Sequence, residues 1–436
     1  MKRLLTLLTC LSLSLVLCGA EWFVSPETGK KKNPGTKEEP LKSIADAIKK
    51  AEAGDTIYLA AGLYTGAMGA SEIVVDKPLT LLGGYTTDFS ARDVIANPTL
   101  IQPKNEKNDT ARKAIINLQL PPGNPELAMV IDGLVIDEGL MHSYHKEKGK
   151  PEGVETGMWL KPPAKDKADK FSSATCYGIY SESKLRYEGK LVIQNCIFAN
   201  TGDTAIVVSK WLGDCEIKNN LFVACRQTAC DVTCSNPKQA VKCEFKNNTV
   251  LFTWSSTDDF GSMGYGYRTQ ENIEAKIENN IFGLNITAGV NHAKGNAKKK
   301  QVSLDENVFF LNRKGDIDLQ GGGAVLLSLK VADDEFEELE DAPGIESLED
   351  NVSLDDPTVF KGRINEAYLN GFLNASYSET TDYDENSPAN TFRAAMGMNK
   401  VGKIETKVSM YANRYPLEEC AKLFGALEGY GAQIPR

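Results

Sequence analysis

One eight-residue phrase occurs five times, with small changes, between residues 191 and 309. The copies are Leu191–Phe198, Cys215–Phe222, Cys243–Val250, Ala275–Phe282 and Val302–Phe309. Their first residues lie 24, 28, 32 and 27 positions apart, and uneven repetition at about 20–50 residues is typical of a solenoid. Apolar residues alternate or cluster within each copy as in short strands, without helical periodicity. The repeating unit is therefore predicted to be a β-coil.

A second short phrase, with a small, an apolar and a variable residue in order, recurs beside these copies. The triplets are Gly178–Tyr180, Ala205–Val207, Ala229–Asp231, Gly266–Arg268, Gly289–Asn291 and Asp316–Asp318. Side chains alternate between the two faces of a strand, so a third residue points outward when the middle residue points inward. Vertical neighbours in such a row lie about 5 Å apart. The predicted outward row is Tyr180, Val207, Asp231, Arg268, Asn291 and Asp318.

The opening of the chain and the turn phrase resemble secreted pectate-lyase-like β-helix proteins over roughly residues 21–325. The resemblance rests on the Ile-x-Asn-Asn turns and on Trp22–Pro26, Pro40–Ile48, Gly54–Leu59 and Ala61–Thr65. It implies an all-β fold, a right-handed parallel β-helix with three short strands per coil. It also implies that the triplets lie on the first strand of each coil, the face that these enzymes use for substrates. The polygalacturonase segments NTD, DD, GHG and RIK do not occur as a set, so no catalytic subfamily is identified.

The chain divides into four predicted parts. Residues 1–20 have a basic start, an apolar stretch and small residues before the expected cleavage after Ala20, as in a secretory signal peptide. Residues 21–325 form the β-helix, with residues 41–53 as an amphipathic cap helix and a polar insertion at about 138–174. Residues 326–350 read as an acidic linker and residues 351–436 as a small C-terminal cap or appended domain.

These features predict an exported protein, secreted, periplasmic or held at the cell surface. A lipid anchor at Cys18 is the alternative, disfavoured because Leu17 fits a lipobox poorly. No stretch after the signal is long and apolar enough to cross a bilayer. The net charge of −10 argues against binding to nucleic acid or to an anionic membrane.

Cysteines and asparagines recur at fixed places in the repeated phrase. Cys215 and Cys243 should lie one coil apart, about 4.8 Å, where a disulfide and a stack of buried thiols are both open. A ladder of stacked side-chain amides is predicted at the turns. Its members are Asn195, Asn219, Asn247 and Asn279.

Candidate catalytic residues gather around the middle of the outward row. Cleavage of a uronate chain by β-elimination needs a cation beside the substrate carboxylate and a base that removes a proton. Arg268, Asp231, Lys210 and His292 are the residues predicted for these catalytic roles. Hydrolysis would instead need two carboxylates flanking the bond, which Asp231, Asp258, Asp259 and Asp318 are able to supply.

The remaining candidates are assigned to substrate and metal. Trp254 is predicted as a stacking platform for sugar, and Asp258 and Asp259 as ligands of a Ca²⁺ ion. The other predicted substrate contacts are Asn291, Asp318, Tyr180 and Lys294.

The sequence thus predicts a protein that acts on or recognises an extracellular acidic polysaccharide or other glycan. β-Elimination is the first choice of chemistry and glycoside hydrolysis the second. The alternative is a non-catalytic cell-surface or envelope β-helix that binds glycans or protein partners. The oligomeric state is not indicated. An organised charge cluster in an open groove would favour an enzyme, and a row of paired charges would favour a binding protein.

Overall fold

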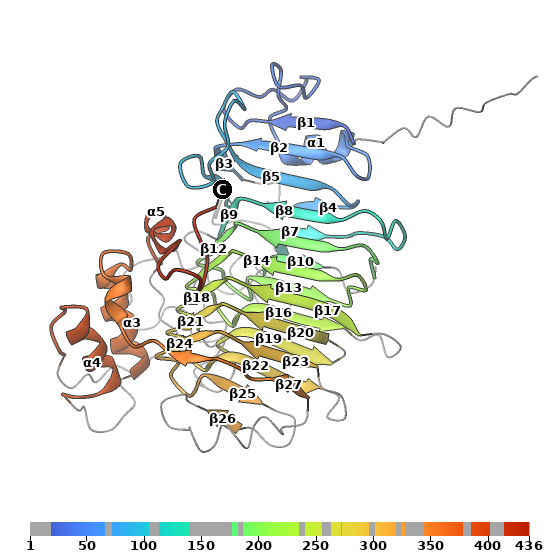
Figure 1. Cartoon of the computed structure of the whole chain (residues 1–436). Helices are drawn as coiled ribbons and strands as arrows, with labels where there is room; N and C mark the ends of the chain where they lie inside the picture. Colours follow the sequence, from blue (N-terminus) through green and yellow to red (C-terminus); the bar gives the residue numbers. More distant parts are fainter. Residues whose placement is uncertain are drawn as a thin grey trace, which may run out of the picture.

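The chain folds into a right-handed parallel β-helix, as the resemblance to pectate-lyase-like proteins implied, and its coils are those that the repeated phrase predicted (Figure 1). The computed structural model describes residues 19–65, 72–103, 113–138, 177–181, 186–234, 240–254, 263–271, 273–295, 301–319, 325–327, 344–377, 385–401 and 414–435. Three long sheets, here A, B and C, run along the solenoid. A typical coil gives one strand to each sheet, in the chain order C, A, B.

The strands of each sheet are stacked in chain order. Sheet A contains β1 (Glu21–Val24), β2 (Thr56–Ala60), β5 (Thr80–Tyr85), β8 (Met129–Asp132), β11 (Leu191–Gln194), β14 (Cys215–Lys218), β17 (Val241–Lys246), β20 (Ile273–Glu278), β23 (Val302–Asp305) and β27 (Ile345–Ser347). Sheet B contains β3 (Gly62–Tyr64), β6 (Thr99–Ile101), β9 (Leu134–Asp137), β12 (Ile197–Ala199), β15 (Leu221–Val223), β18 (Thr249–Leu251), β21 (Ile281–Gly283), β24 (Val308–Phe310) and β28 (Val352–Ser353). Sheet C contains β4 (Ile73–Val75), β7 (Ala114–Leu118), β10 (Tyr177–Ser181), β13 (Ile206–Ser209), β16 (Thr228–Cys234), β19 (Tyr265–Glu271), β22 (Ala288–Gly295), β25 (Ile317–Leu319) and β26 (Val325–Leu327). The last pair, β25 and β26, is antiparallel, whereas the other strand pairs are parallel.

The predicted cap helix is α1 (Ile44–Lys50), beside the first coil. The Ser43 hydroxyl accepts a hydrogen bond from the Asp46 backbone N–H and so caps the helix. Ile44, Ala47 and Ile48 are buried in the solenoid core. The helix thereby covers apolar side chains that an end coil would otherwise expose.

The C-terminal helices cover the outer face of sheet B (Figure 1). They are η3 (Pro357–Phe360), α3 (Glu366–Tyr377), α4 (Pro388–Ala395), α5 (Leu417–Cys420) and η4 (Ala421–Leu423). Phe310 of sheet B stacks on Phe392 of α4 with ring centroids 5.7 Å apart, and Phe252 packs edge-on against Phe372 of α3 at 5.0 Å. Sheet B is therefore apolar on both faces. Among the described residues, no helix is long and apolar enough to span a membrane.

The last residues of the chain form a strap along the corner between sheets A and B. Gln433 N–H donates to Asn219 Oδ1 at 2.6 Å, and Ala432 N–H donates to Thr249 Oγ1 at 2.9 Å. Gly431 N–H donates to the carbonyl of Asn279 at 2.7 Å. Residues 429–433 thus bond to three successive coils of the solenoid.

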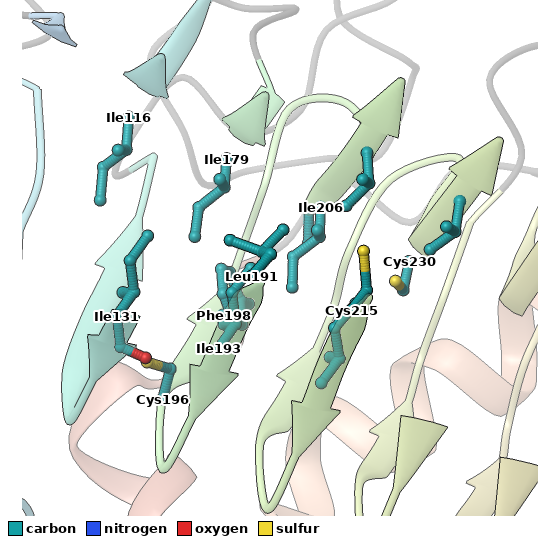
Figure 2. Close-up of a cluster of buried hydrophobic side chains, with 14 of the residues drawn as sticks. Ile116, Ile131, Ile179, Leu191, Ile193, Cys196, Phe198, Ile206, Cys215 and Cys230 are labelled. Atoms are coloured by element: carbon teal, nitrogen blue, oxygen red, sulfur yellow. The ribbon is translucent and has the colours of Figure 1, made fainter. Parts of the chain in front are cut away.

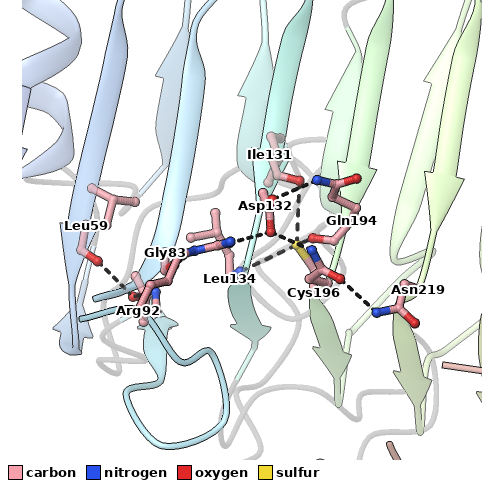
Figure 3. Close-up of polar contacts among 12 residues, drawn as sticks. Leu59, Gly83, Arg92, Ile131, Asp132, Leu134, Gln194, Cys196 and Asn219 are labelled. Carbon is pink, nitrogen blue, oxygen red and sulfur yellow. Dashed lines mark hydrogen bonds and ion pairs between the residues drawn. The ribbon is translucent and has the colours of Figure 1, made fainter. Parts of the chain in front are cut away.

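The corner under the strap has one backbone conformation in six coils. Its first residue lies in the left-handed region, with φ between 52° and 57°, which asparagine tolerates better than most side chains. These residues are Asn195, Asn219, Asn247, Asn279, Glu306 and Asp350. The series begins beside Asp132, which accepts a hydrogen bond from Gln194, as Figure 3 shows. Asn195 Nδ2 also donates to Asp132, at 2.9 Å.

The buried amide ladder consists of the residues one position later in each coil. Asn220 Nδ2 donates to Asn248 Oδ1 at 3.0 Å, Asn248 to Asn280 at 3.2 Å, and Asn280 to Asn307 at 2.9 Å. Asn307 continues the ladder to Asn351 at 3.0 Å. The predicted ladder is present only in part among the described residues, where Asn219 Nδ2 donates to Asn195 Oδ1 at 2.8 Å. The continuous ladder belongs to the second asparagine of each pair, because the first lies at the positive-φ corner and only the second is buried.

Stacked apolar side chains fill the interior (Figure 2). Phe198, Phe222, Phe245, Phe282 and Phe309 form an aromatic column whose ring centroids are 4.9, 6.0, 6.0 and 5.4 Å apart. Cys215 and Cys243 are adjacent in register, as predicted, and both are buried thiols. Burial raises the pKa of Cys243 to about 12, so this part of the core holds protonated, weakly reactive thiols.

Candidate functional site

Sheet C brings the predicted row of third residues side by side. The strand register pairs these residues in the order Tyr180, Val207, Asp231, Arg268, Asn291 and Asp318. The middle residue of each triplet is buried in the core, as at Ile206 and Val290, so the row lies on the outer face of the sheet. Asn117 of β7 extends the row by one coil beside Tyr180.

A hydrogen-bonded network occupies the centre of this face. Arg268 Nη1 lies 3.6 Å from Asp231 Oδ2, and Arg268 Nε donates to Asn291 Oδ1 at 3.2 Å. Asn291 Nδ2 donates to Asp318 Oδ2 at 2.7 Å, and the Tyr265 hydroxyl donates to the same oxygen at 2.9 Å. Burial and the nearby Asp318 carboxylate raise the pKa of Tyr265, which keeps its phenol protonated as a donor. The row is thus one connected polar system.

Two tyrosines lie at the upper end of the network. Tyr177 and Tyr180 stack with ring centroids 5.3 Å apart and an interplanar angle of 14°. Lys113 Nζ lies 3.9 Å from the centre of the Tyr180 ring, within the range of a cation–π contact. Burial raises the pKa of Tyr177, and the phenol also interacts electrostatically with Asp203 and Asp231. Burial and the negative charges of these carboxylates therefore keep the Tyr177 phenol protonated.

Asp203 is the residue of this cluster that the sequence analysis missed. It lies in the turn just before β13, and its side chain is 9% exposed. Its Oδ1 accepts the backbone N–H of Thr204 at 2.7 Å. The turn is held by two charged side chains, because Glu138 accepts the N–H of Gly202 and Arg226 Nη1 donates to the Gly202 carbonyl at 3.3 Å. Asp203 precedes the triplet Ala205–Val207 by two residues, but no sequence pattern shows that it is buried.

Burial gives the Asp203 carboxyl an unusual affinity for protons. Loss of hydration raises its pKa from 3.8 to about 6, against smaller opposing effects of the Thr204 N–H and the Arg226 charge. By contrast, Asp231 is held 3.6 Å from a guanidinium that stabilises its negative charge. The two carboxylates near Tyr177 therefore differ in environment.

The free energy of unfolding of the Asp203→Asn variant, compared with that of the unmodified protein at the same pH, is expected to increase as the pH rises. The pKa of Asp203 is higher in the folded state than in the unfolded state, so its protonation stabilises the fold. This stabilisation is fully present below about pH 4 and is lost as the pH rises through about 6. The change from 3.8 to about 6 corresponds to about 3 kcal/mol. Urea unfolding at pH 4 and pH 8 measures this difference in stability. Asp214 is exposed, so the control variant Asp214→Asn should show no such trend. A gain that shrinks with rising pH would contradict the assignment.

Two predicted site residues are placed away from the network. His292 follows Asn291 in β22, so its ring lies on the opposite, inner face of the strand, where it is 2% exposed. Burial lowers the pKa of His292, and neither ring nitrogen has a hydrogen-bond partner among the described residues. Trp254 is 3% exposed and pairs through its backbone with Cys225 and Gln227. The roles predicted for His292 in surface proton transfer and for Trp254 as an open stacking platform are therefore wrong.

The remaining predicted residues contribute less to the described cluster. Lys210 follows β13, with a positive φ of 58°, and its N–H donates to the Thr233 carbonyl at 3.0 Å. Lys294 is part of β22, but its side chain lies outside the described part of the chain, as do Asp258 and Asp259. Among the described residues no group of three acidic, histidine or cysteine side chains is arranged to hold a metal ion. The Ca²⁺ site at Asp258 and Asp259 stays a prediction.

Two family models match parts of the chain. Residues 177–332 match a model described as a right-handed β-helix region, and residues 27–107 match a family described as a protein of unknown function, DUF1565. A curated relative, the protein Mis18-alpha of Plecturocebus moloch, is 28% identical over 109 residues. That match covers 25% of this chain and 45% of the relative, so the chain spans less than half of that protein.

Two solved structures resemble the chain in part, at low sequence identity. The complex of XylC with xylose is 11% identical, with a TM-score of 0.36, over 69% of this chain and 63% of that chain. The GH136 lacto-N-biosidase of Eubacterium ramulus is 12% identical, with a TM-score of 0.35, over 68% of this chain and 57% of that chain. The three parallel sheets and the match over residues 177–332 identify this part of the chain as a right-handed parallel β-helix.

Proposed function

We propose that the outer face of sheet C recognises an acidic polysaccharide outside the cytoplasm. Arg268 is the observation that carries this proposal, because a guanidinium at the centre of a polar face suits the carboxylate of a uronate sugar. Its side chain is 23% exposed, and its Nη2 has no partner among the described residues. Asp231 and Asn291 hold the group in place through Nη1 and Nε. The extracellular location rests on the signal-like residues 1–20.

The geometry of the row also suits an extended sugar chain. Neighbouring side chains in a parallel sheet repeat about every 4.8 Å along the solenoid, which is close to the length of one sugar unit. The amide of Asn291, the carboxylate of Asp318 and the phenol of Tyr265 are buried and hydrogen-bonded to one another, which makes this part of the face rigid. Lys113 supplies a second cation at the Tyr180 end. A chain lying along the row would meet Asp231 and Arg268, whose side chains are partly exposed. Asn291 and Asp318 are buried and support the Arg268 side chain.

Recognition is better supported than β-elimination. The predicted catalytic set is not assembled on this face, because His292 points into the core and Lys210 lies beyond the end of β13. Arg268 also lies 3.6 Å from the Asp231 carboxylate and donates to Asn291, so its guanidinium is fixed in one orientation on the sheet. These contacts favour a guanidinium that binds and orients substrate.

The Arg268→Ala variant is expected to lose affinity for uronate polymers by about tenfold or more, because hydrogen bonds to a charged group are worth about 1.5–3 kcal/mol. Electrophoresis in gels containing polygalacturonate, alginate or a neutral dextran measures the retention. Lys276→Ala is the matched control, since it removes one cation from the outer face of sheet A, where the side chain is 56% exposed. Equal retention of both variants, or unmodified protein retained by dextran alone, would refute the proposal.

A further inference from the structure

We infer that the groove between the strap and the outer face of sheet A binds a short neutral oligosaccharide. The groove lies at the corner between sheets A and B, on strands other than those of the row on sheet C, so the inference does not depend on the function proposed above. Its volume is about 980 Å³. That volume lies within the range of about 300–1,000 Å³ that is typical of ligand sites.

The repeated coils form one wall of the groove. Gln194, Lys218 and Lys246 end β11, β14 and β17 and are in register on the outer face of sheet A. Successive coils are about 4.8 Å apart, so these three positions extend over about 10 Å, close to the length of two sugar units. A sugar chain lying along the solenoid would therefore meet side chains at about the spacing of its own units.

The strap forms the other wall and is fixed to the solenoid. Asn219 Nδ2 donates to the Gln433 carbonyl at 3.1 Å, and Asn247 Nδ2 donates to the Gly429 carbonyl at 3.2 Å. The Gln433 side chain donates in turn to the Leu427 carbonyl at 2.9 Å. Both walls are thus in place before a ligand enters, which lowers the entropic cost of binding.

The polar groups of the groove suit sugar hydroxyls better than a charged ligand. Lys218 Nζ lies 3.0 Å from Glu216 Oε2, so the charge of this lysine is already offset. Lys246 Nζ lies 3.1 Å from Glu278 Oε2 in the same way. Each lysine side chain is still 44% exposed, and each ammonium has three N–H donors, so donors remain for a ligand.

The opposite wall supplies an acceptor. Glu428 is exposed, lines the groove and forms no ion pair within the described part of the chain. Its carboxylate suits hydroxyl donors and repels an acidic ligand. The groove thus offers donors on one side and an acceptor on the other, with little excess of either charge.

An apolar contact completes the site. Ile434 is 64% exposed, and Pro435 follows it along the groove. Sugar rings have apolar C–H faces, and a ring lying over Ile434 would remove this apolar surface from water. Apolar surface combined with a few placed polar groups is the usual lining of a small-molecule site.

Isothermal titration calorimetry with xylotriose, cellotriose, mannotriose and maltotriose tests the site. At least one of these neutral trisaccharides is expected to bind. Lys246→Ala should weaken that binding by about tenfold or more, the size expected for a lost hydrogen bond to a charged group.

Lys276→Ala is the matched control. Lys246 and Lys276 contact the same Glu278 carboxylate, at 3.1 and 2.6 Å, but Lys276 does not line the groove. Glu278 keeps one lysine in either variant, so the two variants differ in the groove and not in net charge. Lys276→Ala should bind the trisaccharide like the unmodified protein.

A second pair of variants tests the apolar contact. Ile434→Ser should weaken binding by about fivefold, because less apolar surface is covered. Leu63→Ser is its control, since Leu63 is 49% exposed on β3 of sheet B and lies outside the groove. This pair also decides the matter if urea unfolding shows that Lys246→Ala is less stable than Lys276→Ala.

Three results would overturn the inference. The first is that none of the four trisaccharides binds the unmodified protein. The second is equal binding within both pairs of variants, which would mean that the sugar binds elsewhere. The third is tighter binding of trigalacturonate than of any neutral trisaccharide, lost in Lys246→Ala, which would make the groove a site for acidic ligands.

Discussion

Replacing Asn248 with alanine is expected to destabilise the protein by about 4 kcal/mol or more. Asn248 Oδ1 accepts the backbone and side-chain N–H groups of Asn220, each at 3.0 Å, and Asn248 Nδ2 donates to the Ile217 carbonyl at 2.9 Å. All these groups are buried, and each buried group left without a partner costs about 1–3 kcal/mol. The loss should appear as a lower urea concentration at the unfolding midpoint.

The neighbouring residue provides the control. Asn247 lies at φ 52° on the outside of the same turn, where glycine adopts the backbone conformation without strain. Asn247→Gly removes only the hydrogen bond to the Gly429 carbonyl at 3.2 Å and should cost less than about 1 kcal/mol. Similar losses for the two variants would mean that the ladder does not stabilise the turn.

Replacing Arg414 with alanine is expected to cost about 3–5 kcal/mol, because it leaves a buried carboxylate without its counter-charge. Arg414 Nη2 lies 2.7 Å from Asp137 Oδ2, and the Asp137 side chain is completely buried. Asn200 also donates to Asp137, at 2.9 Å, and binds the backbone of Tyr415. The pair thus joins the solenoid to the segment that leads into α5. Urea unfolding measures the loss.

The effect of Arg414→Ala should depend on pH and on its partner. Burial raises the pKa of Asp137, and the charge of Arg414 opposes that rise. Without Arg414 the carboxyl should take up a proton more readily, so the deficit in stability should shrink as the pH falls. The double variant Asp137→Asn, Arg414→Ala should recover part of the loss. A deficit that is independent of pH and unchanged in the double variant would mean that the ion pair is not its cause.

The sequence predicted the solenoid and the row on sheet C because both follow from short repeats. Strand alternation alone was enough to place Asp231, Arg268 and Asn291 in register. A sixth copy of the phrase, Glu346–Ser353, was overlooked because its acidic residues resemble the preceding charge run. Its Asn351 ends the amide ladder, and β27 and β28 extend sheets A and B into this stretch.

The parts of the candidate site that the sequence analysis missed depend on burial and on the direction of side chains in neighbouring coils. Asp203 looks like an ordinary turn residue, and only packing shows that it is shielded from water. His292 follows the outward residue Asn291 in β22, so strand alternation turns its ring inward, away from the predicted catalytic role. The choice between the two asparagines of each pair needed the sign of φ, which the sequence does not reveal.

The strap formed by residues 429–433 has a consequence for how cooperatively the solenoid unfolds. A solenoid held only by contacts between neighbouring coils behaves as a one-dimensional array, in which coils form and open semi-independently. Residues 429–433 bond to three successive central coils, so none of these coils can open without breaking hydrogen bonds to a segment distant in the sequence. Fraying that starts at either end of the solenoid should therefore stop at these three coils, which open together.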